Sequence, residues 1–226
     1  MKQMKAVIFD MDGVISNTVH LHYIVNKKVA DQLGIAFSQE WNQQLQGLSR
    51  RATVEAIVEK AAVALSDKEF DHLCELKNSH YKELINSLTT EDAQPGIRSF
   101  IEELKERGIP MVIASASRNA NLVLTRLELV DHFHGIVDVT TLKQGKPDPE
   151  IFLKAAEIVD VYPSACVAIE DGEAGLKGIM ETEMFSVGVG AEPALTKADY
   201  YIASTKELTV ASLEKALNKH ERTLYR

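Results

Sequence analysis

Short apolar runs alternate with helical patterns over most of this chain, and that alternation limits the possible folds more than any other feature. Each run is rich in β-forming residues, and the segment after it has apolar residues every three or four positions. This pattern predicts an α/β fold built on a doubly wound parallel sheet. The predicted strands are 7–9, 111–114, 136–137, 166–169, 184–189 and 200–202, with helices near 97–104, 122–127, 151–158, 173–180 and 213–217.

A long stretch after the first predicted strand interrupts the alternation. From residue 17 to about residue 89 the apolar positions follow helical spacing only, over 21–33, 50–65 and 67–88. Asn17 or Thr18 could cap the first of these helices, and Gly34 would end it. Such a stretch is large enough for a small domain. We therefore predict a core domain of residues 1–16 and 90–226 with an inserted all-helical domain of residues 17–89.

Carboxylates and other polar groups follow three of the predicted strands. Asp10 and Asp12 come directly after the first strand, and alternate residues of an extended chain point to the same side. Ligand sites in doubly wound sheets lie beyond the carboxyl ends of the strands. Neighbouring carboxylates favour a cation between them, and hard oxygen ligands suit Mg²⁺. The other polar residues expected at this edge are Ser115, Ser117, Lys146, Glu170 and Asp171.

Each of these residues also has an ordinary structural explanation when it is taken alone. Asp10 to Gly13 could be an acidic turn, and Ser115 could cap the helix that follows it. Lys146 could be a solvated loop charge. The convergence of all of them on one sheet edge favours a functional site.

Composition excludes several classes of partner. The formal net charge of −8 disfavours nucleic acid and anionic membrane surfaces. The two cysteines, Cys74 and Cys166, lie in apolar patterns and form no disulfide framework, which fits a reducing cytoplasm. The run before Asp10 is too short for a signal peptide, and no stretch approaches the ~20 apolar residues of a membrane span.

The motifs around these residues resemble those of the haloacid dehalogenase-like phosphotransferases. The four family motifs occur in order, as Asp10-Met11-Asp12-Gly13-Val14, Ser115, Lys146-Pro147 and Glu170-Asp171. Within that superfamily the chain is most similar to the β-phosphoglucomutases, over nearly its whole length. The resemblance implies a Rossmann-like core with a helical cap. The chain departs from close relatives at three positions. It has Asn17 where they often carry Asp, Gly172 where they often carry Ser or Ala, and Arg118 where they often carry Lys.

The resemblance also implies a catalytic role for each core residue. Asp10 would be the nucleophile that forms an aspartyl phosphate, and Asp12 would be the general acid and base. Mg²⁺ would be held by Asp10, Glu170 and Asp171, with the backbone carbonyl of Asp12. Ser115 and Lys146 would hold the transferring phosphoryl group, and Thr18 and His22 belong to the implied catalytic set, with His22 beside Asp12.

The resemblance also implies a set of substrate-binding residues, most of which lie in the predicted helical cap. Arg50 would grip the non-reacting phosphate, although a residue in this position is ordinarily a first-turn surface residue. Lys77 and Asn78 would contact the sugar, although Lys77 could be a solvated helix charge. The implied binding residues are Gly47, Leu48, Ser49, Arg50, Lys77, Asn78, Ser117, Arg118 and Asn119.

These implied residues leave more than one function open. One is an isomerising phosphotransferase that converts β-glucose 1-phosphate into glucose 6-phosphate through a 1,6-bisphosphate. Another is a sugar-phosphate phosphatase of the same fold, and a third is a non-catalytic binding protein. The first two differ in whether a sugar hydroxyl or water attacks the aspartyl phosphate, so only the cap residues separate them. In each case we expect a monomer with a small sugar-phosphate ligand.

Overall fold

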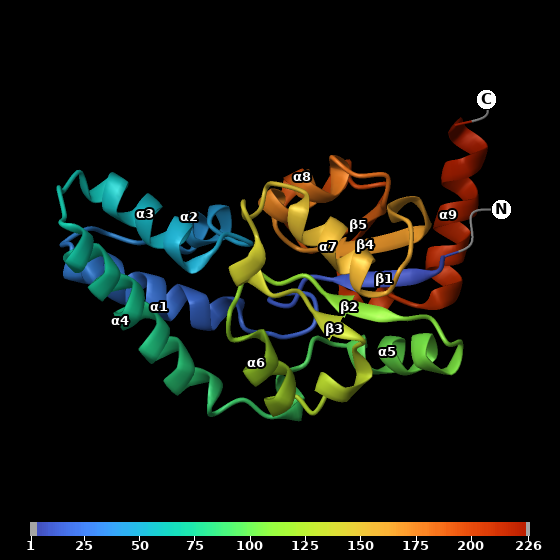
Figure 1. Ribbon diagram of the computed structural model, residues 1–226, viewed down its shortest axis with the longest axis horizontal. Helices are drawn as coiled ribbons and strands as arrows, with labels where there is room; N and C mark the ends of the chain where they lie inside the picture. Colours follow the sequence, from blue (N-terminus) through green and yellow to red (C-terminus); the bar gives the residue numbers. More distant parts are fainter. Residues whose placement is uncertain (1–3, 225–226) are drawn as a thin grey trace.

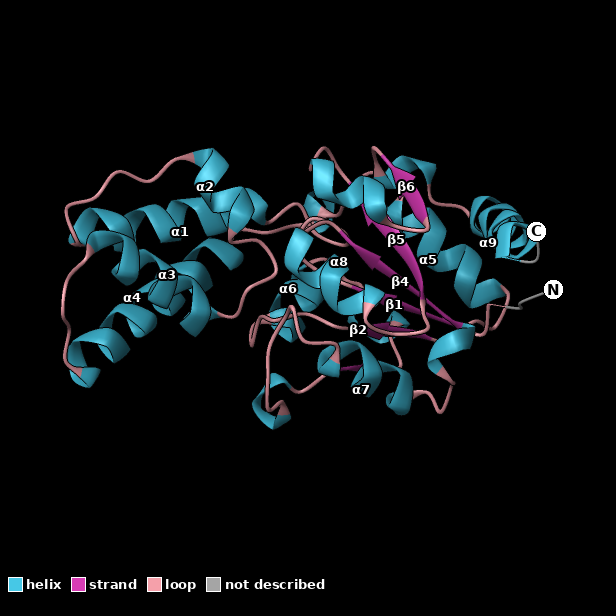
Figure 2. Cartoon of the chain, turned by 90° about the horizontal axis from the view of Figure 1, so that it is seen from above, coloured by secondary structure: helices cyan, strands magenta, loops and turns pink. Residues whose placement is uncertain are grey.

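A six-stranded parallel sheet forms the centre of the molecule (Figures 1 and 2). The structure is a computed structural model and describes residues 4–224. The strand order is β3-β2-β1-β4-β5-β6, so the chain moves outward from β1 in one direction and then in the other. This is the predicted doubly wound fold. The strands are β1 (Ala6–Phe9), β2 (Met111–Ile113), β3 (Gly135–Ile136), β4 (Cys166–Glu170), β5 (Phe185–Val189) and β6 (Tyr200–Ile202).

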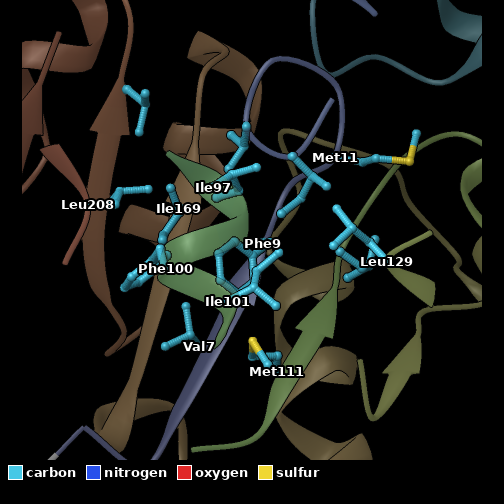
Figure 3. Close-up of a cluster of buried hydrophobic side chains, with 14 of the residues drawn as sticks. Val7, Phe9, Met11, Ile97, Phe100, Ile101, Met111, Leu129, Ile169 and Leu208 are labelled. Atoms are coloured by element: carbon cyan, nitrogen blue, oxygen red, sulfur yellow. The ribbon is translucent and has the colours of Figure 1, made fainter. Parts of the chain in front are cut away.

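Helices cover both faces of the sheet because alternate side chains of β1 point to opposite faces. Val7 and Phe9 pack with Phe100 in a cluster that α5, α6 and α9 complete (Figure 3). Ala6 and Ile8 pack on the other face, against α7 and α8. Burial on both faces explains why this strand reads as a continuous apolar run. The helices are α5 (Ile97–Glu106), α6 (Ala120–Arg126), α7 (Glu150–Ile158), α8 (Glu173–Met180) and α9 (Val210–Leu224).

The four remaining α-helices lie together at one end of the molecule, beyond the carboxyl ends of the strands (Figure 1). They are α1 (Val19–Gln32), α2 (Gln39–Gln44), α3 (Arg50–Ala61) and α4 (Asp67–Ile85), and we call them the helical cap. The cap has its own buried cluster, which includes Val29, Val54 and Ile57. The sequence did not predict α2, which is six residues long and starts at the Ser38 cap. The domain borders at residues 17 and 89 remain a prediction.

Short 3₁₀ helices complete the connections around the core. They are Thr90–Asp92, Val130–His132, Val139–Thr141, Pro163–Ala165, Pro193–Lys197 and Thr205–Glu207. A bilayer-spanning helix is absent from the part of the chain that the structure describes.

Candidate active site

The switch point of the sheet brings the acidic residues together. β1 pairs with β4 in parallel, with Phe9 opposite Ile169, and the backbone N–H of Asp10 donates to the carbonyl of Ile169 at 2.9 Å. Asp10 and Glu170 therefore leave neighbouring strands side by side, at the position where such sheets bind ligands. One carboxylate oxygen from each of Asp10, Glu170 and Asp171 lies within 4.8 Å of the others.

A cavity of about 550 Å³ opens between these strand ends and the helical cap. Most of the residues predicted for the site line this cavity, so the fold gathers a set that is scattered over the sequence. Four of them lie outside its lining: Thr18, Ser115, Glu170 and Asp171. The lining residues from the predicted set are Asp10, Asp12, His22, Gly47, Leu48, Ser49, Arg50, Lys77, Asn78, Ser117, Arg118, Asn119 and Lys146.

Lys146 joins two of the carboxylates. Its ammonium group lies 2.5 Å from Asp10 Oδ1 and 2.8 Å from Glu170 Oε2, and all three side chains are buried. Burial alone would lower the pKa of Lys146, but the carboxylates of Asp10 and Glu170 raise it above its usual value, so this lysine stays charged. The structure therefore does not support the alternative of a solvated loop charge.

The single positive charge of Lys146 does not neutralise the three neighbouring carboxyl groups of Asp10, Glu170 and Asp171. Burial and then the charge of Glu170 raise the pKa of Asp10 above its usual range, although Lys146 opposes both effects. Burial and the charges of Glu170 and Asp10 also raise the pKa of Asp171 well above its usual value. A site with this excess of negative charge is suited to a cation.

Two glycines create the space that the carboxylates occupy. A Cβ atom at Gly13 would lie 1.9 Å from Asp171 Oδ2, and one at Gly175 would lie 1.9 Å from Glu170 Oε2. Any other residue would push a carboxylate out of place, and Gly13 also has a φ of +91°. Closely placed, hard carboxylate oxygens are the donor set of a divalent metal site, so the residues present fit such an ion.

Asp12 points away from this acidic group and toward the cap. Its Oδ1 accepts a short hydrogen bond from the hydroxyl of Thr18 and another from the Tyr81 hydroxyl at 3.1 Å. His22 Nε2 lies 3.2 Å from the same oxygen, and its ring stacks on Tyr81. Thr18 precedes α1 as expected, but its hydroxyl does not cap the helix, because it is committed to Asp12.

The surroundings of Asp12 and Asp10 separate their pKa values. Burial alone would raise the pKa of Asp12, but the nearby His22 and the donors Thr18 and Tyr81 hold it below its usual value. Asp12 is therefore ionised in this state and suited to accept a proton. Carboxyl groups whose pKa values are driven apart in this way are typical of an acid–base site.

Ser115 is buried at the end of β2 and is not the cap of the next helix. Its hydroxyl oxygen accepts from the backbone N–H of Ser117 at 3.1 Å, whereas α6 begins at Ala120 with Asn119 in the cap position. Asn119 Nδ2 donates to Asn78 Oδ1 at 3.2 Å, so this loop of the core contacts α4 of the cap.

The cap end of the cavity is positively charged. Arg50 is the first residue of α3 and pairs with Glu75 at 3.0 Å. Lys77 is 6% exposed, and among the side chains that the structure describes, residues 4–220, none forms a hydrogen bond or ion pair with its ammonium group. Burial, and then the charge of Arg50, lower the pKa of Lys77 to about 8.

Two residues of the site were not predicted from the sequence. Tyr81 donates to Asp12 from a position 69 residues away, and Gln46 donates to Asp171 Oδ2 at 2.8 Å from 125 residues away. Both lie in the cap, where the sequence shows only a helical pattern and a loop. The one available signal for Gln46 was that it directly precedes the implied binding residue Gly47.

The family model of the haloacid dehalogenase-like hydrolases matches residues 4–180. The chain belongs to this family. It is 45% identical to beta-phosphoglucomutase of Bacillus subtilis over 93% of this chain and 94% of that protein. The crystal structure of beta-phosphoglucomutase from Clostridium difficile matches with a TM-score of 0.92 and 36% identity, and covers 99% of this chain and 100% of that one. A phosphorylated carbohydrates phosphatase of Thermotoga maritima is 31% identical over 77% of this chain and 79% of that protein.

Proposed function

We propose that this member of the haloacid dehalogenase-like family is a β-phosphoglucomutase that interconverts β-glucose 1-phosphate and glucose 6-phosphate. The similarity to beta-phosphoglucomutases over 93% and 99% of the chain supports this choice. The observation that carries it is the side chain of Lys77, which is 6% exposed, lines the cap end of the cavity beside Arg50 and has no acidic partner among the described residues.

A lysine that is largely shielded from water, close to an arginine and without an acidic partner lowers stability, so its place in the cavity lining supports the binding of an anion there. A mutase must bind a bisphosphate in two orientations, with one phosphate at Asp10 and the other at a distant cationic site. Arg50 and Lys77 give the cap end of the cavity the charge for that second phosphate, and the guanidinium group of Arg50 can donate two parallel hydrogen bonds. The N-terminus of α3 adds a favourable dipole.

At the core end, a carboxylate oxygen of Asp10 attacks the phosphorus atom and the bond from phosphorus to the sugar oxygen breaks. Asp12 gives its proton to that leaving oxygen, and in the reverse direction it takes the proton of the attacking hydroxyl. Lys146 and Ser115 hold the phosphoryl oxygens. Asp10, Glu170 and Asp171 would hold a Mg²⁺ ion, which would supply positive charge against the repulsion between carboxylate and phosphate.

Because its pKa is low, Asp12 is ionised and can act first as the base of this cycle. When Asp10 carries the phosphoryl group, an ionised Asp12 removes the proton from the incoming sugar hydroxyl. It is then protonated and ready to serve as the acid for the next transfer, so a single carboxyl group performs both roles.

Product analysis tests the proposal. The protein is incubated with β-glucose 1-phosphate, Mg²⁺ and a trace of the 1,6-bisphosphate, and glucose 6-phosphate and free phosphate are measured together. We expect glucose 6-phosphate as the main product. Free phosphate as the main product, released from many sugar phosphates, would show a phosphatase instead.

The Arg50→Ala variant makes the test specific to the cap. Loss of a bidentate, charge-assisted contact worth about 3 kcal/mol lowers mutase turnover at least about a hundredfold. Slow hydrolysis of the phosphoenzyme should continue, because Asp10 and Asp12 are intact. Arg107, whose side chain is 44% exposed, pairs with Glu103 and Glu214 on the core and does not line the cavity, so the control variant Arg107→Ala should keep most of its turnover.

A further inference from the structure

We infer that Gln46 is a positioning residue that couples docking of the helical cap to the metal ligand Asp171. Its side-chain amide, in the loop after α2, donates from Nε2 to Asp171 Oδ2 at 2.8 Å. Among the described residues, Gln46 is the one whose side chain donates a hydrogen bond to this carboxylate. The contact therefore joins the cap to the acidic group of the core.

The backbone around Gln46 is fitted to the same part of the core. A Cβ atom on Gly172 would lie 3.3 Å from the carbonyl oxygen of Gln46, so a larger residue at this position would require the cap loop to shift slightly. Gly47 turns the cap loop with a φ of +78°, and a Cβ atom there would lie 3.6 Å from the backbone nitrogen of Gly175. The loop of the cap thus packs closely on the start of α8 in addition to forming the hydrogen bond.

The chemistry of the amide suits a metal ligand. A carboxylate that binds a cation through one oxygen is oriented best when its other oxygen accepts a hydrogen bond. A lysine or arginine at residue 46 would bring a charge that competes with the cation. The amide of Gln46 is neutral, so it can hold Oδ2 of Asp171 and leave the negative charge of the acidic group for the metal.

This contact forms only when the cap is docked, because Gln46 belongs to a loop of the cap and Asp171 follows strand β4 of the core. Cap docking should therefore strengthen metal binding, and by thermodynamic linkage the metal should favour the docked cap by the same factor. Gln46 would thus make the transfer site complete only when the cavity is closed. The inference rests on the proposed function solely through the metal site, and not on the identity of the sugar or of the acceptor.

Two variants remove the contact in different ways. Gln46→Met keeps the length of the side chain and loses the donor, and Gln46→Asn keeps the amide and shortens its reach. The control is Gln44→Met, at an exposed position of α2 that does not line the cavity. Mg²⁺ binding is measured by titration calorimetry without any sugar, and cap docking by the radius of gyration from X-ray scattering with and without Mg²⁺.

We expect both Gln46 variants to bind Mg²⁺ about tenfold more weakly than the wild type, the lower end of the effect of losing an outer hydrogen-bond partner. Mg²⁺ should make the wild type and Gln44→Met more compact, and the Gln46 variants less so. Wild-type affinity and compaction in both Gln46 variants would overturn the inference. Absence of Mg²⁺ binding in the wild type would instead overturn the metal site itself, and neither result depends on mutase activity.

Discussion

Replacement of Lys77 by methionine should stabilise the protein while it impairs substrate binding. Lys77 is 6% exposed, and burial and the charge of Arg50 lower its pKa from the usual 10.5 to about 8. At about 1.4 kcal/mol for each pKa unit, this difference corresponds to about 3 kcal/mol of folding free energy lost to the buried charge at pH 7. Methionine fills a similar volume without a charge. We therefore expect Lys77→Met to be more stable than the wild type by up to about 3 kcal/mol at pH 7.

The pH dependence of this effect has a defined sign. Between pH 8 and 10.5 the folded protein has lost the proton of Lys77 while the unfolded chain still holds it, so the stability of the wild type rises with pH in that window. The stability gap to Lys77→Met should shrink to about half its value by pH 9.5. Urea unfolding at pH 7 and pH 9.5 measures the gap, and Lys82→Met, at an exposed position of α4, should change stability by less than about 0.5 kcal/mol. A Lys77→Met protein that is less stable than the wild type at pH 7, or a gap that does not change with pH, would refute this reasoning.

Three further substitutions test the core of the site. Asp10→Asn should abolish turnover and the base-labile phosphoenzyme, and retained activity above about a thousandth of wild type would exclude it as the nucleophile. Asp171→Ala should weaken Mg²⁺ binding in calorimetry, so an unchanged affinity would show that the ligand set is wrong. Tyr81→Phe removes one hydrogen bond to the charged Asp12, worth about 1.5 kcal/mol, so the acid limb of the kcat/KM profile should move up by about one pH unit, whereas an unmoved limb would show that Asp12 does not titrate there.

The sequence predicts most of the fold because the core elements have strong local patterns. β1 is a continuous apolar run that is buried on both faces, and the helix predicted at 173–180 is α8, Glu173–Met180. The cap helix α2 was missed because its six residues include only one large apolar side chain, Trp41. Its boundaries depend on the Ser38 cap and on packing against the rest of the cap, which a periodicity does not reveal.

The site was predictable where a strand end carries its own motif, as at Asp10 and Asp171. The contacts of Asp12 with Tyr81 and of Asp171 with Gln46 were not predictable, because they join segments that are 69 and 125 residues apart. The opposite pKa changes of Asp10 and Asp12 were not predictable either, because burial and Glu170 raise the pKa of Asp10 whereas His22, Thr18 and Tyr81 lower that of Asp12. The hydrogen bond from Thr18 to Asp12 was not predictable for a similar reason, because a threonine before a helix could equally well cap that helix.

The fate of a single phosphoryl group tests the central claim most directly. The protein is first labelled on Asp10 with a radioactive phosphoryl group and freed of the donor. It is then mixed with β-glucose 1-phosphate for one turnover. If the cap end of the cavity holds the substrate phosphate, the label should move to the sugar as the 1,6-bisphosphate faster than it appears as free phosphate. Release of the label mainly as free phosphate, at a rate that the sugar phosphate does not change, would contradict the account.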